Sequence, residues 1–202
     1  MNYEERRALI LKCKCPNEVI YGQTIDLFPY CMNHTSDIVR LRNQKNSLYY
    51  LNQGAAISVT QQEQWASAYH ERDDDIYWCV VDKTKTIIGT IRLYDIAHNG
   101  SCCEIGSFII DEKYAMVGAY ALEAKLLAIT FAFEKLQIER VLNKNRSDNK
   151  NMNSISKRLG SVLLKEFDLR GVPYKLFELR KEKFQKDSLT RILNLWTKRE
   201  LE

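Results

Sequence analysis

The sequence predicts an α+β fold in which helices flank a mixed, mostly antiparallel central sheet. Its 202 residues are 45% hydrophobic and 28% charged, which is typical of one soluble globular domain with a substantial core. Strand-like apolar runs and helix-like apolar periodicity follow one another in the order β, α, α, β, β, β, α, β, α, β, β. Asn99-Gly100 lies between two of the apolar runs and is a strong β-hairpin signal, so we expect antiparallel neighbours there.

The N-terminal third is expected to contain a helix, a strand and two more helices. The helix over residues 3–11 ends at a Cys-Lys-Cys-Pro break, and a strand over residues 19–27 follows. Ser36 is a suitable N-cap for a short helix over residues 37–43. Thr60 and Glu63 have the spacing of a capping box, which predicts a helix that continues to about residue 72.

The middle of the chain is expected to form three strands and one long helix. IYWCVV, over residues 76–81, is a continuous apolar run, as in a strand buried on both faces. Strands over residues 87–96 and 102–110 follow, joined by the Asn-Gly turn. Apolar residues then recur along one face of a helix over residues 121–136, at Leu122, Leu126, Ile129 and Phe133.

Beyond the long helix we expect a strand from residue 140, a polar loop over 145–154 and a short helix over 154–159. Gly160 gives that helix a suitable C-terminal stop. A hairpin over residues 161–169 and 172–179 turns at Arg170-Gly171, and a helix with apolar residues at helical spacing follows. These elements divide the chain into an N-terminal helical extension (1–17), a core domain (18–180) and a C-terminal helix (187–202).

Composition excludes several functional classes. The net charge of +4 suits anionic ligands such as phosphates, but the scattered basic residues do not form a nucleic-acid footprint. No run approaches the roughly 18 apolar residues of a membrane span, so we expect no membrane partner. The N-terminus does not resemble a secretory signal, and six cysteines without disulfide-like spacing fit a reducing, cytoplasmic compartment. No histidine has ligand spacing to Cys13-Lys14-Cys15, so no metal site is expected.

Three parts of the chain together resemble a known enzyme family. They are CCEIGSFIIDEKYAMVGAYALEA, then FAFEKLQIERVLNKNRSDNKNMNSISKRLG, and the early pair IVRLRNQ and ISVTQQEQW. The first is similar to the fourth strand, phosphate loop and main helix of the GNAT superfamily of acyl-CoA-dependent N-acyltransferases. The second resembles the end of that helix, the fifth strand and the next helix, with Asn149 eleven residues before Gly160. The third resembles the first helices of members that acylate amino-deoxy sugars carried on a nucleotide.

The resemblance implies a GNAT-like fold over about residues 19–179, with acyl-CoA bound at the turn before the long helix. The family's phosphate loop falls on Met116, Val117, Gly118, Ala119, Tyr120 and Ala121. Its first position is Met rather than a polar or basic residue, and its central glycine is replaced by Ala119. Backbone N–H groups in the first turn of a helix would still bind a pyrophosphate. Alternatively, these small residues only allow close packing of helix on sheet. We assign Asn149 to the same site.

The resemblance also implies that pantetheine pairs with the backbone of the fourth strand at Phe108, Ile109 and Ile110. Acyl transfer further needs a base for the amine, and Glu104 is our candidate because it interrupts an otherwise apolar strand. The alternative is a solvent-facing Glu104. His98, at the tip of the hairpin, is either a competing base or simply solvated.

Ser156 is the candidate for protonating the leaving thiolate. Many family members have Tyr seven positions after the loop asparagine, where this chain has Ser156. A serine can donate a hydrogen bond to sulfur but is a poor acid, and a thiol of modest pKa does not strictly need one. Ser156 as an ordinary helix residue is the alternative.

The acceptor is expected to contact the first two helices and the hairpins. Arg42 and Asn43 are candidates for binding a diphosphate or a sugar hydroxyl. Aromatic residues could supply a stacking wall for a sugar or base, at Tyr49, Tyr50, Trp65 and Tyr69. Because Trp65 and Tyr69 are four residues apart on one helix, they could equally be core.

We therefore expect an N-acyltransferase that moves an acetyl or somewhat larger acyl group from acyl-CoA to a nucleotide-linked amino-deoxy sugar. The amine would attack directly in a ternary complex. One alternative is an N-acetyltransferase of a protein N-terminus or of a small amine such as an antibiotic, and another is a non-catalytic acyl-CoA sensor. The terminal helices could form a homodimer contact or pack against their own chain.

Overall fold

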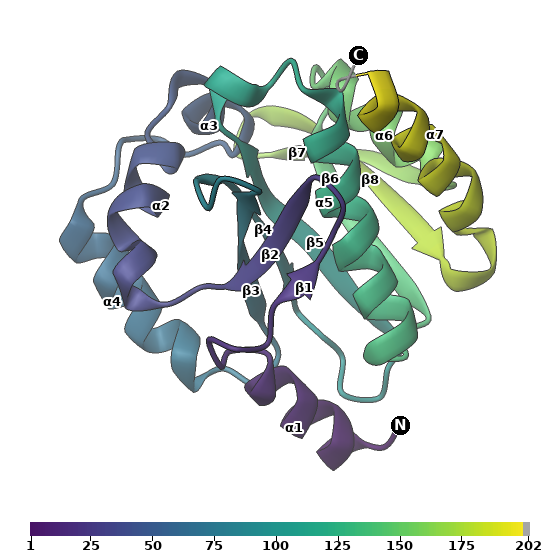
Figure 1. Cartoon of the computed structure of the whole chain (residues 1–202), viewed down its shortest axis with the longest axis horizontal. Helices are drawn as coiled ribbons and strands as arrows, with labels where there is room; N and C mark the ends of the chain where they lie inside the picture. The colour runs from purple at the N-terminus through teal and green to yellow at the C-terminus, as the bar shows by residue number, and fades with distance from the viewer. Residues whose placement is uncertain (200–202) are drawn as a thin grey trace.

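The computed structural model describes residues 1–199 and confirms the α+β fold (Figure 1). Its strands form one eight-stranded sheet in the order β1-β2-β3-β4-β5-β6-β8-β7. They are β1 (Ile20–Tyr21), β2 (Ile25–Pro29), β3 (Ile76–Asp82), β4 (Ile87–Tyr94), β5 (Cys102–Ile110), β6 (Arg140–Arg146), β7 (Val162–Leu169) and β8 (Val172–Arg180). The helices are α1 (Tyr3–Lys12), α2 (Thr35–Arg42), α3 (Lys45–Tyr50), α4 (Val59–Glu71), α5 (Gly118–Thr130), α6 (Lys150–Arg158) and α7 (Lys186–Arg199). The last three residues of the expected C-terminal segment 187–202 lie outside the described residues.

The sheet is mixed and mostly antiparallel, as predicted. Neighbouring strands run antiparallel except for β5 and β6, which pair in parallel. Parallel neighbours need a crossover connection, and α5 provides it. The strand pair that α5 connects is the pair on which the candidate site is built.

Helices cover both faces of the sheet. Strand β3 is therefore buried on both sides, which accounts for its continuous apolar run. Alternate residues Ile76, Trp78 and Val80 join the core that also contains α5 and α7. Tyr77, Cys79 and Val81 join a second core with residues of α2 and α4. Because side chains alternate between the faces of a strand, a strand between two cores needs a continuous apolar run. Figure 1 shows α2 and α4 on one side of the molecule and α5, α6 and α7 on the other.

Both terminal helices pack on their own chain. Ile10 of α1 is buried, and Arg6 Nε donates to the carbonyl oxygen of Leu136 at 2.9 Å. Leu189 and Leu193 of α7 are buried in the core that includes α5. Among residues 1–199, no helix is both long enough and apolar enough to cross a membrane.

Two predicted N-caps were wrong. Helix α4 begins two residues earlier than expected, and its capping box joins Ser58 to Gln61 instead of Thr60 to Glu63. The Ser58 hydroxyl accepts from Gln61 N at 3.2 Å, and Ser58 N donates to Gln61 Oε1 at 2.8 Å. Ser36 lies inside α2, which begins at Thr35. Both chain segments offer more than one small polar residue close together, so spacing alone does not select the cap.

Four other elements also differ from the prediction. The expected strand over residues 19–27 is broken into β1 and β2 at Gly22, where an added Cβ would lie 2.5 Å from Ile25 O. Helix α3 was not expected, and α5 begins at Gly118 and ends in a π-helical turn over Phe131–Lys135. The polar segment expected as a loop forms most of α6, whose N-cap Asn149 accepts from Met152 N at 3.1 Å.

Candidate active site

Strands β5 and β6 separate soon after they meet. Their parallel pairing covers only residues 102–104 against 140–142. Just beyond, Asn143 Nδ2 donates to Ile105 O at 3.1 Å, so a side chain replaces the next backbone contact. Strand β5 also contains a bulge, where Ser107 has φ of 45° and the register with β4 shifts. The edge of β5 that faces β6 therefore has no strand partner over its last residues, and we call this opening the fork.

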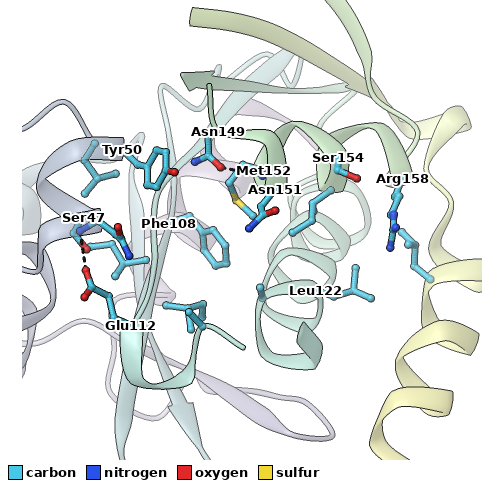
Figure 2. Close-up of a pocket in the computed structure, with 18 of the residues that line it drawn as sticks. Ser47, Tyr50, Phe108, Glu112, Leu122, Asn149, Asn151, Met152, Ser154 and Arg158 are labelled. Atoms are coloured by element: carbon cyan, nitrogen blue, oxygen red, sulfur yellow. Dashed lines mark hydrogen bonds between the residues drawn. The ribbon is translucent and has the colours of Figure 1, made fainter. Parts of the chain in front are cut away.

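A cleft of about 430 Å³ lies at the fork (Figure 2). Figure 2 shows Phe108 in its middle, with Ser47 and Tyr50 of α3 on one side and Leu122 of α5 on the other. Among the sequence candidates, the cleft is lined by Tyr50, Phe108, Ile109, Ile110, Ala121 and Asn149. These residues come from α3, β5, α5 and the loop before α6, so the fold brings together the segments that the resemblance assigned to acyl-CoA.

The start of α5 borders the cleft and suits an anion. Its N-cap, Val117, provides no side-chain cap, and Tyr120 N donates to Val117 O at 3.2 Å, so the N–H groups before Tyr120 are the ones that an anion can meet. The helix dipole adds attraction for negative charge. Ala121 lines the cleft, whereas Ala119 is buried in the core and Met116 is 95% exposed. Tyr120, like Val117, packs partly buried against that core.

Glu104 is a buried, paired carboxylate at the base of the fork. It is 5% exposed, so it does not face solvent. Its neighbours Cys103 and Ile105 belong to the core beneath α5, so Glu104 points to the opposite face of the sheet. There it accepts a hydrogen bond from the Tyr94 hydroxyl and lies 2.5 Å from Lys144 Nζ. Burial, together with the charge of Glu104, raises the pKa of Tyr94 well above its usual range.

Ser156 is buried beneath the fork and does not line the cleft. Its hydroxyl lies 2.9 Å from Asn143 Oδ1 and 3.0 Å from Met152 O, and both are acceptors for its single proton. Asn145 Nδ2 donates to the same hydroxyl at 3.2 Å. These bonds fasten α6 to β6, so Ser156 acts here as an anchor of the helix.

His98 lies away from the fork. It is in the turn that precedes β5, at the opposite end of that strand from Phe108. Its ring packs on Tyr3 with centroids 4.7 Å apart, and its Nε2 is 3.4 Å from Asp73 Oδ1. The fold therefore does not bring His98 together with Glu104 or with the cleft.

Arg42 and Asn43 hold the segment between α2 and α4. Arg42 donates from Nε and Nη2 to Gln53 Oε1 at 3.1 and 2.8 Å. Asn43 exchanges two hydrogen bonds with the backbone of Ile57, each 2.8 Å long. Neither side chain lines the cleft, and both shape the loop that carries α3.

Tyr49 forms a contact across the fork. Its hydroxyl donates to Asp148 Oδ2 at 2.5 Å, and the Arg146 guanidinium carbon lies 3.9 Å from its ring centroid. Its neighbour Tyr50 lines the cleft instead. Trp65 lies in the aromatic cluster beneath α4, where it stacks on Tyr69 with centroids 5.3 Å apart.

The sequence analysis did not assign α7 or Arg158 to the site. Leu189, Ile192 and Trp196 of α7 form an apolar wall of the cleft. The apolar spacing of this helix was visible, but it does not reveal which surface the helix covers. Arg158, the last residue of α6, also lines the cleft, and no hydrogen bond or ion pair within residues 1–199 engages its guanidinium.

The family model described as an acetyltransferase (GNAT) domain matches residues 26–162, which is more than half of the chain. The chain belongs to the GNAT family. It is therefore an acyl-CoA-dependent N-acyltransferase, and its GNAT domain covers β2 to the start of β7. No curated protein matches this sequence significantly.

Several solved GNAT structures resemble this fold. Apo FdhC, described as a nucleotide-linked sugar GNAT, has a TM-score of 0.73 at 23% identity and covers 86% of this chain and 96% of its own. A GCN5-related N-acetyltransferase from Brucella melitensis has a TM-score of 0.74 at 18% identity, with coverages of 89% and 87%. Spermidine N-acetyltransferase from Vibrio cholerae, in complex with CoA and spermine, has a TM-score of 0.73 at 17% identity, with coverages of 80% and 98%. At such identities the likeness shows the fold alone.

Proposed function

We propose that this GNAT enzyme transfers an acetyl or somewhat larger acyl group to the amine of a nucleotide-linked amino-deoxy sugar in the cytoplasm. The amine attacks acyl-CoA directly in a ternary complex. The observation that carries the proposal is the cleft that joins the start of α5 to the fork. The cleft combines the start of a helix, which can bind an anion, with a strand edge that has no partner. Acyl-CoA is an extended thioester that carries phosphates, so it requires both features.

The phosphates of acyl-CoA lie at the start of α5, and the rest of the molecule extends along the cleft towards the fork. The pyrophosphate meets the first backbone N–H groups of α5, before Tyr120, where Ala115 and Ala121 leave room. The pantetheine follows the unpaired edge of β5 along Phe108–Ile110, and its amides replace the missing strand partner. Arg158 offers a cation for a further phosphate, and Trp196 offers a ring face for adenine.

The chemistry takes place where β5 and β6 meet. A backbone N–H of β5 stabilises the negative charge that develops on the thioester oxygen. Glu104 accepts the proton that the amine loses, directly or through a water molecule. Because Glu104 lies on the face covered by α2 and α4, the acceptor approaches from that face, whereas acyl-CoA lies on the side of α5.

The charges near the fork favour an anionic acceptor over a polyamine. Among the described residues that line the cleft, one is a carboxylate, Glu112, which already accepts from Asn46 N at 2.7 Å. Lys144 and Arg146 of β6 lie beside the fork and are paired with Glu104 and Asp148, so neither of those carboxylates is free for a polyamine. A polyamine would need several free carboxylates, whereas a sugar diphosphate needs cations. FdhC, which is described as a nucleotide-linked sugar GNAT, supports the same choice by its shared fold.

The test is a thiol-release assay with acetyl-CoA and longer acyl-CoAs. The acceptors are a panel of nucleotide-linked amino-deoxy sugars, with spermidine and a peptide carrying a free N-terminus as competitors. We expect release with a sugar of this class and a loss of about 100-fold or more in kcat/KM for Glu104→Gln. Glu166→Gln is the matched control, because this glutamate is 58% exposed on β7.

The other outcomes separate the alternatives. Release with spermidine or the peptide and with no sugar would replace the proposed acceptor class. Tight CoA binding without release from any amine would favour an acyl-CoA sensor. Full activity of Glu104→Gln with the correct sugar would keep the acceptor and remove Glu104 as the base.

A further inference from the structure

Lys125 is a buried cation without a charged partner. It lies on the inner face of α5, and only 1% of its surface is exposed. Within residues 1–199, no hydrogen bond or ion pair engages its Nζ, which lies 5.2 Å from the centroid of the Phe108 ring. By contrast, the neighbouring buried Glu123 accepts hydrogen bonds from the backbone N–H groups of Thr24 and Ile25. An unpaired buried charge is unfavourable, and such groups concentrate at functional sites.

The Lys125 side chain borders the base of the fork. It lines a small cavity of about 10 Å³, together with Ile105 and Asn143, which follow the last parallel pair of β5 and β6. Phe108 connects this cavity to the main cleft, because it lines the cleft and lies against Lys125. A thioester that follows β5 inward from Ile110 therefore approaches the ammonium when it reaches the fork.

Lys125 is also the available proton donor at this position. Ser156 lines the same small cavity, but its single hydroxyl proton is shared between Asn143 Oδ1 and Met152 O. The ammonium of Lys125 carries three N–H groups that no described acceptor engages. Tyr94, the nearest hydroxyl to Glu104, is on the opposite face of the sheet and donates to that carboxylate.

We propose that Lys125 is a catalytic residue of the acyl transfer, whose ammonium protonates the departing CoA thiolate. The proposal rests on acyl-CoA binding in the cleft as set out above, but not on the identity of the acceptor. Attack by the amine forms the C–N bond and moves the carbonyl π pair onto oxygen. When the carbonyl re-forms, the C–S bond breaks and its electron pair leaves on sulfur. Lys125 gives the sulfur a proton and becomes a neutral amine, while the proton from the acceptor nitrogen goes to Glu104.

The ionisation of Lys125 suits this step. Burial lowers the pKa of Lys125 from 10.5 to about 8. An ordinary thiol has a pKa of about 8.5, so proton transfer to the thiolate is close to balanced. Among the described residues that line the small cavity, no other side chain is ionisable. Glu104 lies on the far face of β5 and is paired with Lys144. Solvent restores the proton of Lys125 after CoA leaves.

The first test follows the thiol of bound CoA and needs no acceptor. Thiolate formation is recorded by ultraviolet absorbance during a pH titration, with the complex of desulfo-CoA as the reference for the protein's own groups. We expect the pKa of the bound thiol to lie about one unit or more below that of free CoA, because a cation favours the thiolate. This shift should vanish in Lys125→Met and persist in Lys135→Met, whose lysine is exposed on the π-helical turn that continues α5. Equal titration curves for the native protein and Lys125→Met would overturn the proposal.

The second test measures turnover with an acceptor that the native enzyme uses. We expect kcat of Lys125→Met to fall about 100-fold, while the Kd for CoA changes little. A weakened Kd with unchanged kcat would make Lys125 a binding residue and overturn the proposal. If no acceptor is found among the nucleotide-linked sugars, the proposed acceptor class fails, and the thiol titration still decides the role of Lys125.

Discussion

Replacing Lys125 with methionine should stabilise the fold at neutral pH. Folding lowers the pKa of this lysine from 10.5 to about 8 because it removes the ammonium from water. Each unit of pKa shift corresponds to about 1.4 kcal/mol, so the buried charge costs about 3 kcal/mol of unfolding free energy. Methionine has a flexible apolar chain of similar length and removes that cost while it fills the same space. The native residue is thus unfavourable for stability, as expected of a side chain kept for chemistry.

The pH dependence of this effect has a definite sign. Below pH 8, Lys125 is charged in both states, and the full cost of about 3 kcal/mol is present. Between pH 8 and 10.5 the unfolded chain keeps a proton that the folded chain has lost, so the contribution of Lys125 to stability rises with pH. Above pH 10.5 both states are neutral and the cost is gone. The advantage of Lys125→Met should therefore shrink towards zero across this window.

Urea unfolding, followed by circular dichroism from neutral pH to pH 10.5, measures this advantage directly. Comparing the variant with the native protein at each pH cancels the titration of all other groups. Lys135→Met is the control, since its exposed lysine should leave the unfolding free energy unchanged. If Lys125→Met were no more stable than the native protein, or if its advantage did not depend on pH, the ammonium would not be desolvated and the reasoning would fail.

Three further changes test other parts of the structure. Glu123→Ala removes the acceptor for the N–H groups of Thr24 and Ile25, at 2.8 and 3.2 Å, and should lower the unfolding free energy by about 3 kcal/mol or more in a urea titration. Gly89→Ala puts a Cβ 2.2 Å from Ile109 O, so it should push β4 from β5, lower the melting temperature and weaken CoA binding. Gly54→Ala is its control, because an added Cβ there meets nothing within 4 Å; equal melting temperatures for both variants would contradict the close approach. Arg158→Ala should weaken CoA binding about tenfold by calorimetry, and an undiminished affinity would show that Arg158 does not contact a phosphate.

Strands with local signals were predictable from the sequence, whereas only the second half of α6 was. The apolar run of β3 and the Asn99-Gly100 turn each mark their element within a few residues. Helix α6 is held to β6 by buried polar groups instead, including Asn145 Nδ2, which donates to Asn153 Oδ1 at 3.2 Å. Ser156 joins the same network. The segment over residues 149–154 is rich in Asn and Ser, which are typical of turns, so the first residues of α6 were taken for a loop.

Some residues of the candidate site could be predicted from the sequence, and others could not. Phe108–Ile110 and Asn149 lie in contiguous motifs, so a family resemblance could assign them. The partners of Arg42 and Asn43 depend on how a long loop folds back, which their local sequence does not encode. Lys125 did leave a signal, because it follows Leu122 by three residues and precedes Ile129 by four, on the apolar stripe of its helix.

The short seam between β5 and β6 has a consequence for how the protein opens. Strands β1–β5 and β6–β8 of the sheet are joined by only three backbone-paired positions, so native-state amide exchange should reveal two cooperative units that meet at the seam. Helices α5 and α7 pack across one side of the junction, and Tyr49 bridges it with Asp148 on the other. A ligand in the cleft touches both units at once. Acyl-CoA should thus act as a clamp that slows exchange in both units together and couples their unfolding.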